Sequence, residues 1–127
     1  MKVLVFGKHA LQGDDLAIKT ARKLSGKLKK INFVECQDPL AILEEKQNVT
    51  ILDVAKGISK VQYIKSENLN ISKKVSLHDF DLAIAIKLAN KMQPSKKMKI
   101  LAIPLNYTEK KAVNETKKIL EKKVLRQ

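Results

Sequence analysis

Residues 2–7 read KVLVFG, and this short apolar run ending on a glycine decides the fold class. Four consecutive apolar residues without polar alternation are typical of a strand that is buried on both faces. A helical pattern follows, because apolar residues recur at intervals of three and four through segment 14–29. A buried strand followed by an amphipathic helix is typical of an α/β sheet with crossover helices.

The same alternation of strands and helices continues along the chain. Further strands are predicted at 31–36, 49–54, 60–65 and 98–104, and further helices at 39–45, 80–92 and 108–125. Segment 60–65, KVQYIK, alternates apolar and polar residues, so we expect a half-exposed strand that is antiparallel or at an edge. The pattern predicts a single domain over residues 1–127, a three-layer α/β/α sandwich with a twisted, mostly parallel sheet of about five strands.

The charge of the chain raises the question of a nucleic-acid partner. The 127 residues include 26 Lys and Arg against 13 Asp and Glu, a formal net charge of +13. Only Arg22 and Arg126 are arginines, so guanidinium groups that could bind phosphates are scarce. The only aromatic residues are two Tyr and three Phe, so few rings could stack on bases. We expect the lysines to form a solvated surface. A basic nucleic-acid-binding module is an alternative that rests on charge alone.

Other features of the composition bear on location. No apolar run approaches the roughly 18 to 20 residues of a membrane span, and no cleavage site of a secretory signal follows the apolar residues 3–6. The single cysteine, Cys36, cannot form an intrachain disulfide. Because it closes the strand at 31–36, we expect it in the core and not as a nucleophile. We therefore expect a cytoplasmic protein without a membrane span, and a monomer.

Residues that can carry chemistry follow the predicted strands. In an open α/β sheet, ligands bind beyond the carboxyl ends of the strands. Loop 7–15, GKHALQGDD, opens the first helix with Asp14 and Asp15, Asp53 stands at the end of the third strand, and His78 lies at the start of helix 80–92. We expect these side chains at one edge of the sheet. Two carboxylates and one imidazole are a three-ligand shell for nickel or zinc that leaves open positions.

Each of these residues also has a local structural explanation. The helix-opening acids suit the positive end of a helix dipole, and one of them can cap the helix. Asp53 can be a turn acid after a buried strand. His78 can lie inside a capping box, because Ser76 and Asp79 have the S-x-x-D spacing of that motif. The spacing alone leaves both explanations open.

Three segments of the chain together resemble the hydrogenase maturation endopeptidases, which trim the carboxyl-terminal tail of the large subunit of nickel-iron hydrogenases. The segments are VFGKHALQGDDLAI at 5–18, ILDVAKG at 51–57 and SLHDFDL at 76–82. The third of them, in this order with the other two, is the most specific. The resemblance covers most of the chain and implies a phosphorylase/hydrolase-like form of the sandwich.

The resemblance also implies an activity and the residues that carry it. Carried over position by position, it makes Asp15, Asp53 and His78 the metal ligands and the catalytic residues, with Asp14 as a helix-capping neighbour. The implied metal is nickel supplied by the substrate, for which zinc or cadmium can substitute. The implied partner is the precursor of a nickel-iron hydrogenase large subunit, cleaved after nickel insertion. Within the same site, Asp15 or Asp53 acting as a general base is an alternative.

The chain departs from the family pattern in its first loop. Lys8 stands where the family has an asparagine, Leu16 and Ala17 stand where glycines are common, and the loop is one residue longer. These departures motivate a second hypothesis, a maturation-linked protein that binds the metallated precursor without cutting it. His9 in this loop is either an extra ligand or a surface residue, and we expect a surface residue.

Overall fold

The computed structural model describes residues 1–7, 15–45, 48–66, 76–77 and 80–125. Strands and helices alternate along this part of the chain. The elements are β1 (Lys2–Phe6), α1 (Leu16–Ser25), β2 (Asn32–Cys36), the 3-10 helix η1 (Pro39–Glu44), β3 (Val49–Lys56), β4 (Gln62–Lys65), β5 (Ser76–Leu77), α2 (Phe80–Met92), β6 (Met98–Pro104) and α3 (Glu109–Leu125).

The strands form one sheet in the order β2-β1-β3-β6-β4, with the short β5 attached to β3. β1 runs parallel to both β2 and β3, and β3 runs parallel to β6. β4 is antiparallel to β6 and lies at an end of this order, which confirms the antiparallel edge strand predicted at 60–65. The mostly parallel sheet predicted from the apolar runs is therefore confirmed.

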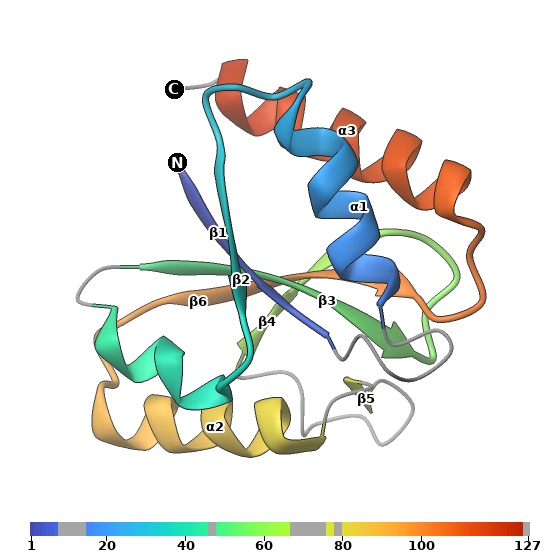
Figure 1. Cartoon of the computed structure of the whole chain (residues 1–127). Coiled ribbons are helices and arrows are strands. Elements are labelled where there is room, and N and C mark those ends of the chain that lie inside the picture. The colour runs from blue at the N-terminus through green and yellow to red at the C-terminus, as the bar shows by residue number, and fades with distance from the viewer. Residues whose placement is uncertain (8–14, 46–47, 67–75, 78–79, 126–127) are drawn as a thin grey trace.

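Helices cover both faces of the sheet. Figure 1 shows α1 and α3 on one side, and α2 with η1 on the other. Because successive side chains of a strand point to opposite faces, each central strand supplies both cores. Leu52 and Leu101 are buried on the side of α1 and α3, while Ile51 and Ile100 are buried under α2. The predicted three-layer α/β/α sandwich is confirmed.

The helix predicted over 14–29 is shorter in the structure. α1 ends at Ser25, where the amides of Lys27 and Leu28 both donate to the carbonyl oxygen of Leu24 and close the last turn. The helices predicted over 80–92 and 108–125 correspond to α2 and α3. Within the described residues, none of the helices combines the length and the apolar character needed to cross a membrane.

Lys96 departs from the expectation that the lysines form a solvated surface. Lys96 is only 9% exposed, and its Nζ donates hydrogen bonds to the carbonyl oxygens of Ile42 (2.6 Å) and Glu45 (2.9 Å). Carbonyls at the end of a helix lack donors within that helix, and Lys96 supplies them at the end of η1. Desolvation lowers the pKa of Lys96, and the nearby Glu45 carboxylate opposes this shift. The side chain therefore ties η1 to the turn between α2 and β6.

Substituting this lysine gives a first prediction. Lys96→Met keeps most of the side-chain volume but leaves two carbonyls without their donor, so we expect the free energy of unfolding to fall by about 1–3 kcal/mol. Urea denaturation measures this change. Lys97→Met at the exposed neighbouring position is the matched control, and we expect it to stay within about 0.5 kcal/mol of the wild type. Equal midpoints for the two variants would contradict this role of Lys96.

Candidate functional site

The order of the strands reverses between β1 and β3. The chain passes from β1 through α1 to β2 on one side of β1, and then returns to place β3 on the other side. In a parallel α/β sheet, ligands bind beyond the carboxyl ends of the two strands where the order reverses. Gly7 follows β1 at this edge, and the second half of β3 with Asp53 leads to it. This is the edge at which the sequence predicts a site.

Asp53 lies inside β3, so its predicted position at the end of the strand is wrong. It is the fifth of the eight residues of β3 and pairs with Ala102 of β6. The strand continues past 54 because β6 pairs with it as far as Ala55 and β5 adds antiparallel partners at Ala55 and Lys56. As a result Asp53 is only 2% exposed.

The side chain of Asp53 lies on the α2 side of the sheet. Ile51 and Ala55, two residues away on either side, belong to the core under α2, whereas Leu52 belongs to the core under α1 and α3. Burial of a carboxylate among apolar residues disfavours its charged form and opposes folding unless other groups compensate. Ionisable groups retained in such places concentrate at functional sites. Among the predicted ligands that the structure describes, Asp53 is the most deeply buried.

Asp15 stands at the N-cap position of α1, but its side chain makes no capping hydrogen bond. Its backbone carbonyl accepts from the amide of Lys19 (2.9 Å), and its carboxylate pairs with Lys19 Nζ at 3.2 Å. The Asp15 side chain is 25% exposed, so solvent screens this pair. Side-chain capping therefore does not explain Asp15, and its carboxylate can exchange Lys19 for another cation.

The short strand β5 fixes the segment before α2 at the carboxyl end of β3. Leu77 pairs with Ala55, Ser76 pairs with Lys56, and α2 begins only at Phe80. Ser76 and Leu77 therefore belong to a strand, and Ser76 does not cap α2. The predicted capping box, in which Ser76 is the capping residue, is wrong. The physical reason is that the edge of β3 offers the backbone of Ser76 a strand partner. His78 is the next residue of the chain after Leu77.

The structure places two of the three predicted ligands. Asp15 and Asp53 are described, whereas His9, Asp14, His78 and Asp79 lie outside the described residues. Within the described ranges, no three His, Cys, Asp or Glu side chains are grouped so that they could hold a metal ion. α1 covers the face opposite to that of the Asp53 side chain. Asp15, at the start of α1, and the side chain of Asp53 therefore belong to opposite sides of the sheet, and the described residues alone do not bring the predicted ligands together.

Cys36 does not have the surroundings of an activated nucleophile. It ends β2 and is half-buried, and its Sγ donates to the carbonyl oxygen of Val34 at 3.5 Å. Burial raises the pKa of the thiol, Lys2 opposes the shift, and Glu45 adds to it. A raised pKa keeps the thiol protonated at neutral pH, while the thiolate is the reactive form. Cys36 packs against the core under α2, as predicted, although it is not fully buried.

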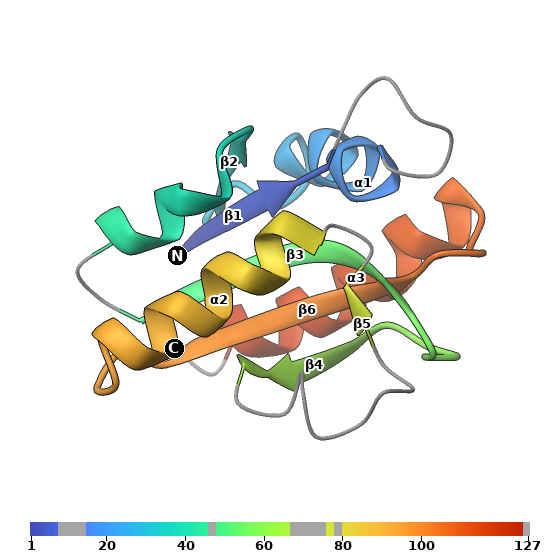
Figure 2. The same cartoon turned by 90° about the horizontal axis from the view of Figure 1, so that it is seen from below.

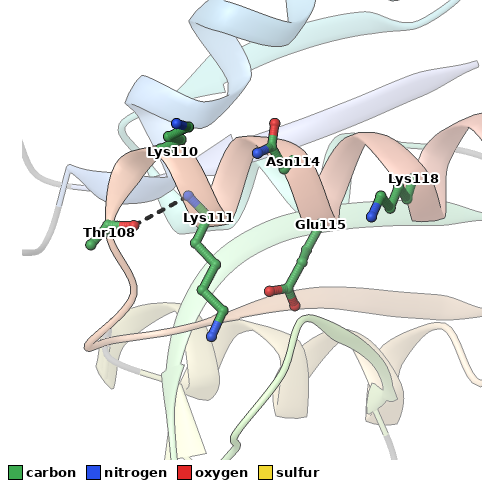
Figure 3. Close-up of a pocket in the computed structure, with 6 residues that line it drawn as sticks. All are labelled: Thr108, Lys110, Lys111, Asn114, Glu115 and Lys118. Atoms are coloured by element: carbon green, nitrogen blue, oxygen red, sulfur yellow. Dashed lines mark hydrogen bonds between the residues drawn. The ribbon is translucent and has the colours of Figure 1, made fainter.

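Two open pockets on the described surface are lined by neither Asp15 nor Asp53. One, of about 330 Å³, is formed on α3 by Thr108, Lys110, Lys111, Asn114, Glu115 and Lys118 (Figure 3). Its polar groups are engaged locally, since Thr108 Oγ1 accepts from the amide of Lys111 and Glu115 accepts from the hydroxyl of Tyr107. The other, of about 280 Å³, lies between η1 and α2. Of the predicted ligands, the two that the structure describes line neither pocket, so the described linings give no support to the predicted site.

The fold and the residues near the carboxyl edge are the basis for assigning a function. Comparison of the chain with protein-family models, curated proteins and solved structures found no match. The features that bear on function are the reversal of strand order, the buried Asp53, the accessible Asp15 and the pairing of β5 with β3.

Proposed function

We propose that the chain is a cytoplasmic endopeptidase that removes the carboxyl-terminal tail from the precursor of a nickel-iron hydrogenase large subunit after nickel insertion. The observation that carries this proposal is the adjacency of the three segments on which the resemblance rests. Val5 of segment 5–18 is the strand partner of Leu52 in segment 51–57. Ala55 of segment 51–57 is in turn the strand partner of Leu77 in segment 76–82.

This adjacency is informative because the segments are far apart in the sequence. Segments so far apart in the sequence do not pair as neighbours of a short hairpin would. A parallel pairing such as that of β1 with β3 needs a long crossover connection. The described parts of the three segments thus lie side by side, and β1, β3 and β5 lead to the carboxyl edge of β3. An α/β sheet binds its ligands at such an edge, which supports a site shared by the three segments.

The candidate ligands suit the chemistry of a borderline divalent ion. Asp15, Asp53 and His78 offer two carboxylates and an imidazole, and such sets bind nickel, with zinc or cadmium as substitutes. In this proposal the nickel belongs to the precursor, and the three side chains bind the precursor beside its scissile bond. An ion held in this way supplies Lewis-acid polarisation of a carbonyl or an activated water. Asp15 or Asp53 as a general base is the alternative with the same residues.

A single-turnover assay tests the proposal. The purified chain is mixed in equal amount with authentic nickel-loaded precursor, and we expect mass spectrometry of the intact proteins to find the shortened subunit and the released tail. Glu121→Gln, a change on the exposed surface of α3, is expected to cleave like the wild type. A stable complex without any released tail would support the non-cutting binding protein instead. Neither complex nor released tail would refute both.

A further inference from the structure

The outer side of α2 carries a row of exposed apolar side chains. Four large hydrophobic residues are exposed in the described part of the chain: Leu40 (49%), Ile84 (49%), Leu88 (41%) and Met92 (63%). Ile84, Leu88 and Met92 follow one another at intervals of four, so they form one row along the helix. Figure 2 shows α2 in front of the sheet, with the side of the helix that faces away from the sheet turned towards the viewer. Such a concentration of exposed apolar surface indicates an interface.

The row borders a groove with acidic residues at its margin. The groove between η1 and α2 has a volume of about 280 Å³ and is lined by Asp38, Pro39, Leu40, Asp81, Ile84, Ala85 and Leu88. Ala85 is buried at its floor, and the apolar side chains Leu40 and Ile84 stand on either side. Two acids here contrast with the net charge of +13 of the chain.

Two charged residues of α2 lie at equal distances along the helix from the pair Ile84 and Leu88. Asp81 lies in the first turn of α2 and Lys91 in the last, and both are exposed. The exposed residues described in α2 are Asp81, Ile84, Lys87, Leu88, Lys91 and Met92. Among them, the pair Ile84 and Leu88 and the pair Asp81 and Lys91 share position 86 as their midpoint, whereas Lys87 and Met92 have no such counterpart. A two-fold axis through this midpoint places Ile84 opposite Leu88 of a second copy and Asp81 opposite Lys91 of a second copy.

We propose that two copies of the chain associate through antiparallel packing of α2 against α2. A two-fold interface requires one surface to match itself, and the pairs Asp81–Lys91 and Ile84–Leu88 do so, while Lys87 lies near its own copy and opposes association. An unrelated partner requires no such symmetry about position 86. The interface contains few large side chains, and the repulsion between two highly positive molecules acts against it. The dimer is therefore weak and forms only at high protein concentration. The proposal differs from the monomer expected from the sequence.

Sedimentation velocity with charge-swap variants tests the dimer. We expect the wild type to shift from monomer towards dimer between about 1 μM and about 1 mM. In a dimer of the Asp81→Lys variant, each of the two Asp81–Lys91 pairs across the axis becomes a pair of like charges. We therefore expect at least about tenfold weaker association. The double variant Asp81→Lys/Lys91→Asp restores opposite charges and is expected to restore association. Glu121→Lys makes the same change in net charge on α3 and is expected to behave like the wild type.

A second variant separates a weakened interface from a weakened helix. Leu88→Ser removes an apolar contact at the centre of the row without changing either charged end of α2, and we expect at least about tenfold weaker association. Circular dichroism identifies any variant that fails to fold. A monomer at every concentration, a dimer that Asp81→Lys and Leu88→Ser leave unchanged, or a folded double variant that stays monomeric would each overturn the proposal. The readout is independent of precursor processing.

Discussion

Replacing Asp53 with asparagine is expected to slow processing of the nickel-loaded precursor by about 100-fold to 10,000-fold while the fold remains intact. Asparagine has nearly the same shape as aspartate but can serve neither as an anionic ligand nor as a general base, and loss of a general base alone has an effect of about this size. Asp53 is the only acid among the eight residues of β3, so no other carboxylate of the strand can replace it. The rate of tail release under single-turnover conditions measures the effect.

Stability distinguishes this role of Asp53 from a purely structural one. Asparagine has nearly the same volume as aspartate, so we expect Asp53→Asn to fold and to unfold in one cooperative thermal transition, and its melting temperature is measured beside the processing rate. Thr50→Val, which changes another buried polar residue of β3, is the matched control and is expected to process at the wild-type rate. An Asp53→Asn variant that is less stable but processes normally would show that Asp53 is only structural.

The fold is largely predictable from the sequence because its pattern is dense and local. The apolar residues of 98–104 are buried almost without interruption, as expected of a central parallel strand. The pattern in 60–65 correctly indicates an antiparallel edge strand, which begins at Gln62 and packs Tyr63 and Ile64 against opposite cores. Helix 80–92 was predictable for a similar reason, since Leu82, Ala85, Ile86 and Ala89 repeat at helical spacing and are all buried.

Features that depend on contacts between distant segments were not predictable in this way. The strand predicted to end at 54 continues to Lys56 because β5 and β6 pair with it there, and neither partner is local to it. The same pairing makes Ser76 a strand residue instead of a helix cap. Lys96 resembles a surface lysine in the sequence, and only the end of η1, about fifty residues earlier, explains why it is buried.

The candidate site shows the same division between local and distant information. The position of Asp15 at the start of a helix follows from its neighbours in the sequence. The burial of Asp53 and the face on which its side chain lies depend on where β3 sits in the sheet, which the sequence pattern leaves open. The role of His78 rests on the resemblance and on its position next to Leu77 in the chain.

Omitting nickel from the substrate is expected to have an effect at least as large as that of Asp53→Asn. If Asp15, Asp53 and His78 bind the nickel of the precursor, a nickel-free precursor lacks the contact that positions its scissile bond. Loss of positioning reduces a rate by about 100-fold or more. We therefore expect nickel-free precursor to remain uncut over a time in which the loaded precursor is fully processed.

The most direct test of nickel recognition compares the two precursors side by side. The same preparation of the chain, treated with a chelator so that nickel comes only from the substrate, is incubated with nickel-loaded and with nickel-free precursor. Mass spectrometry follows the released tail over time. Nickel recognition predicts release from the loaded precursor alone, and equal release from both precursors would contradict it.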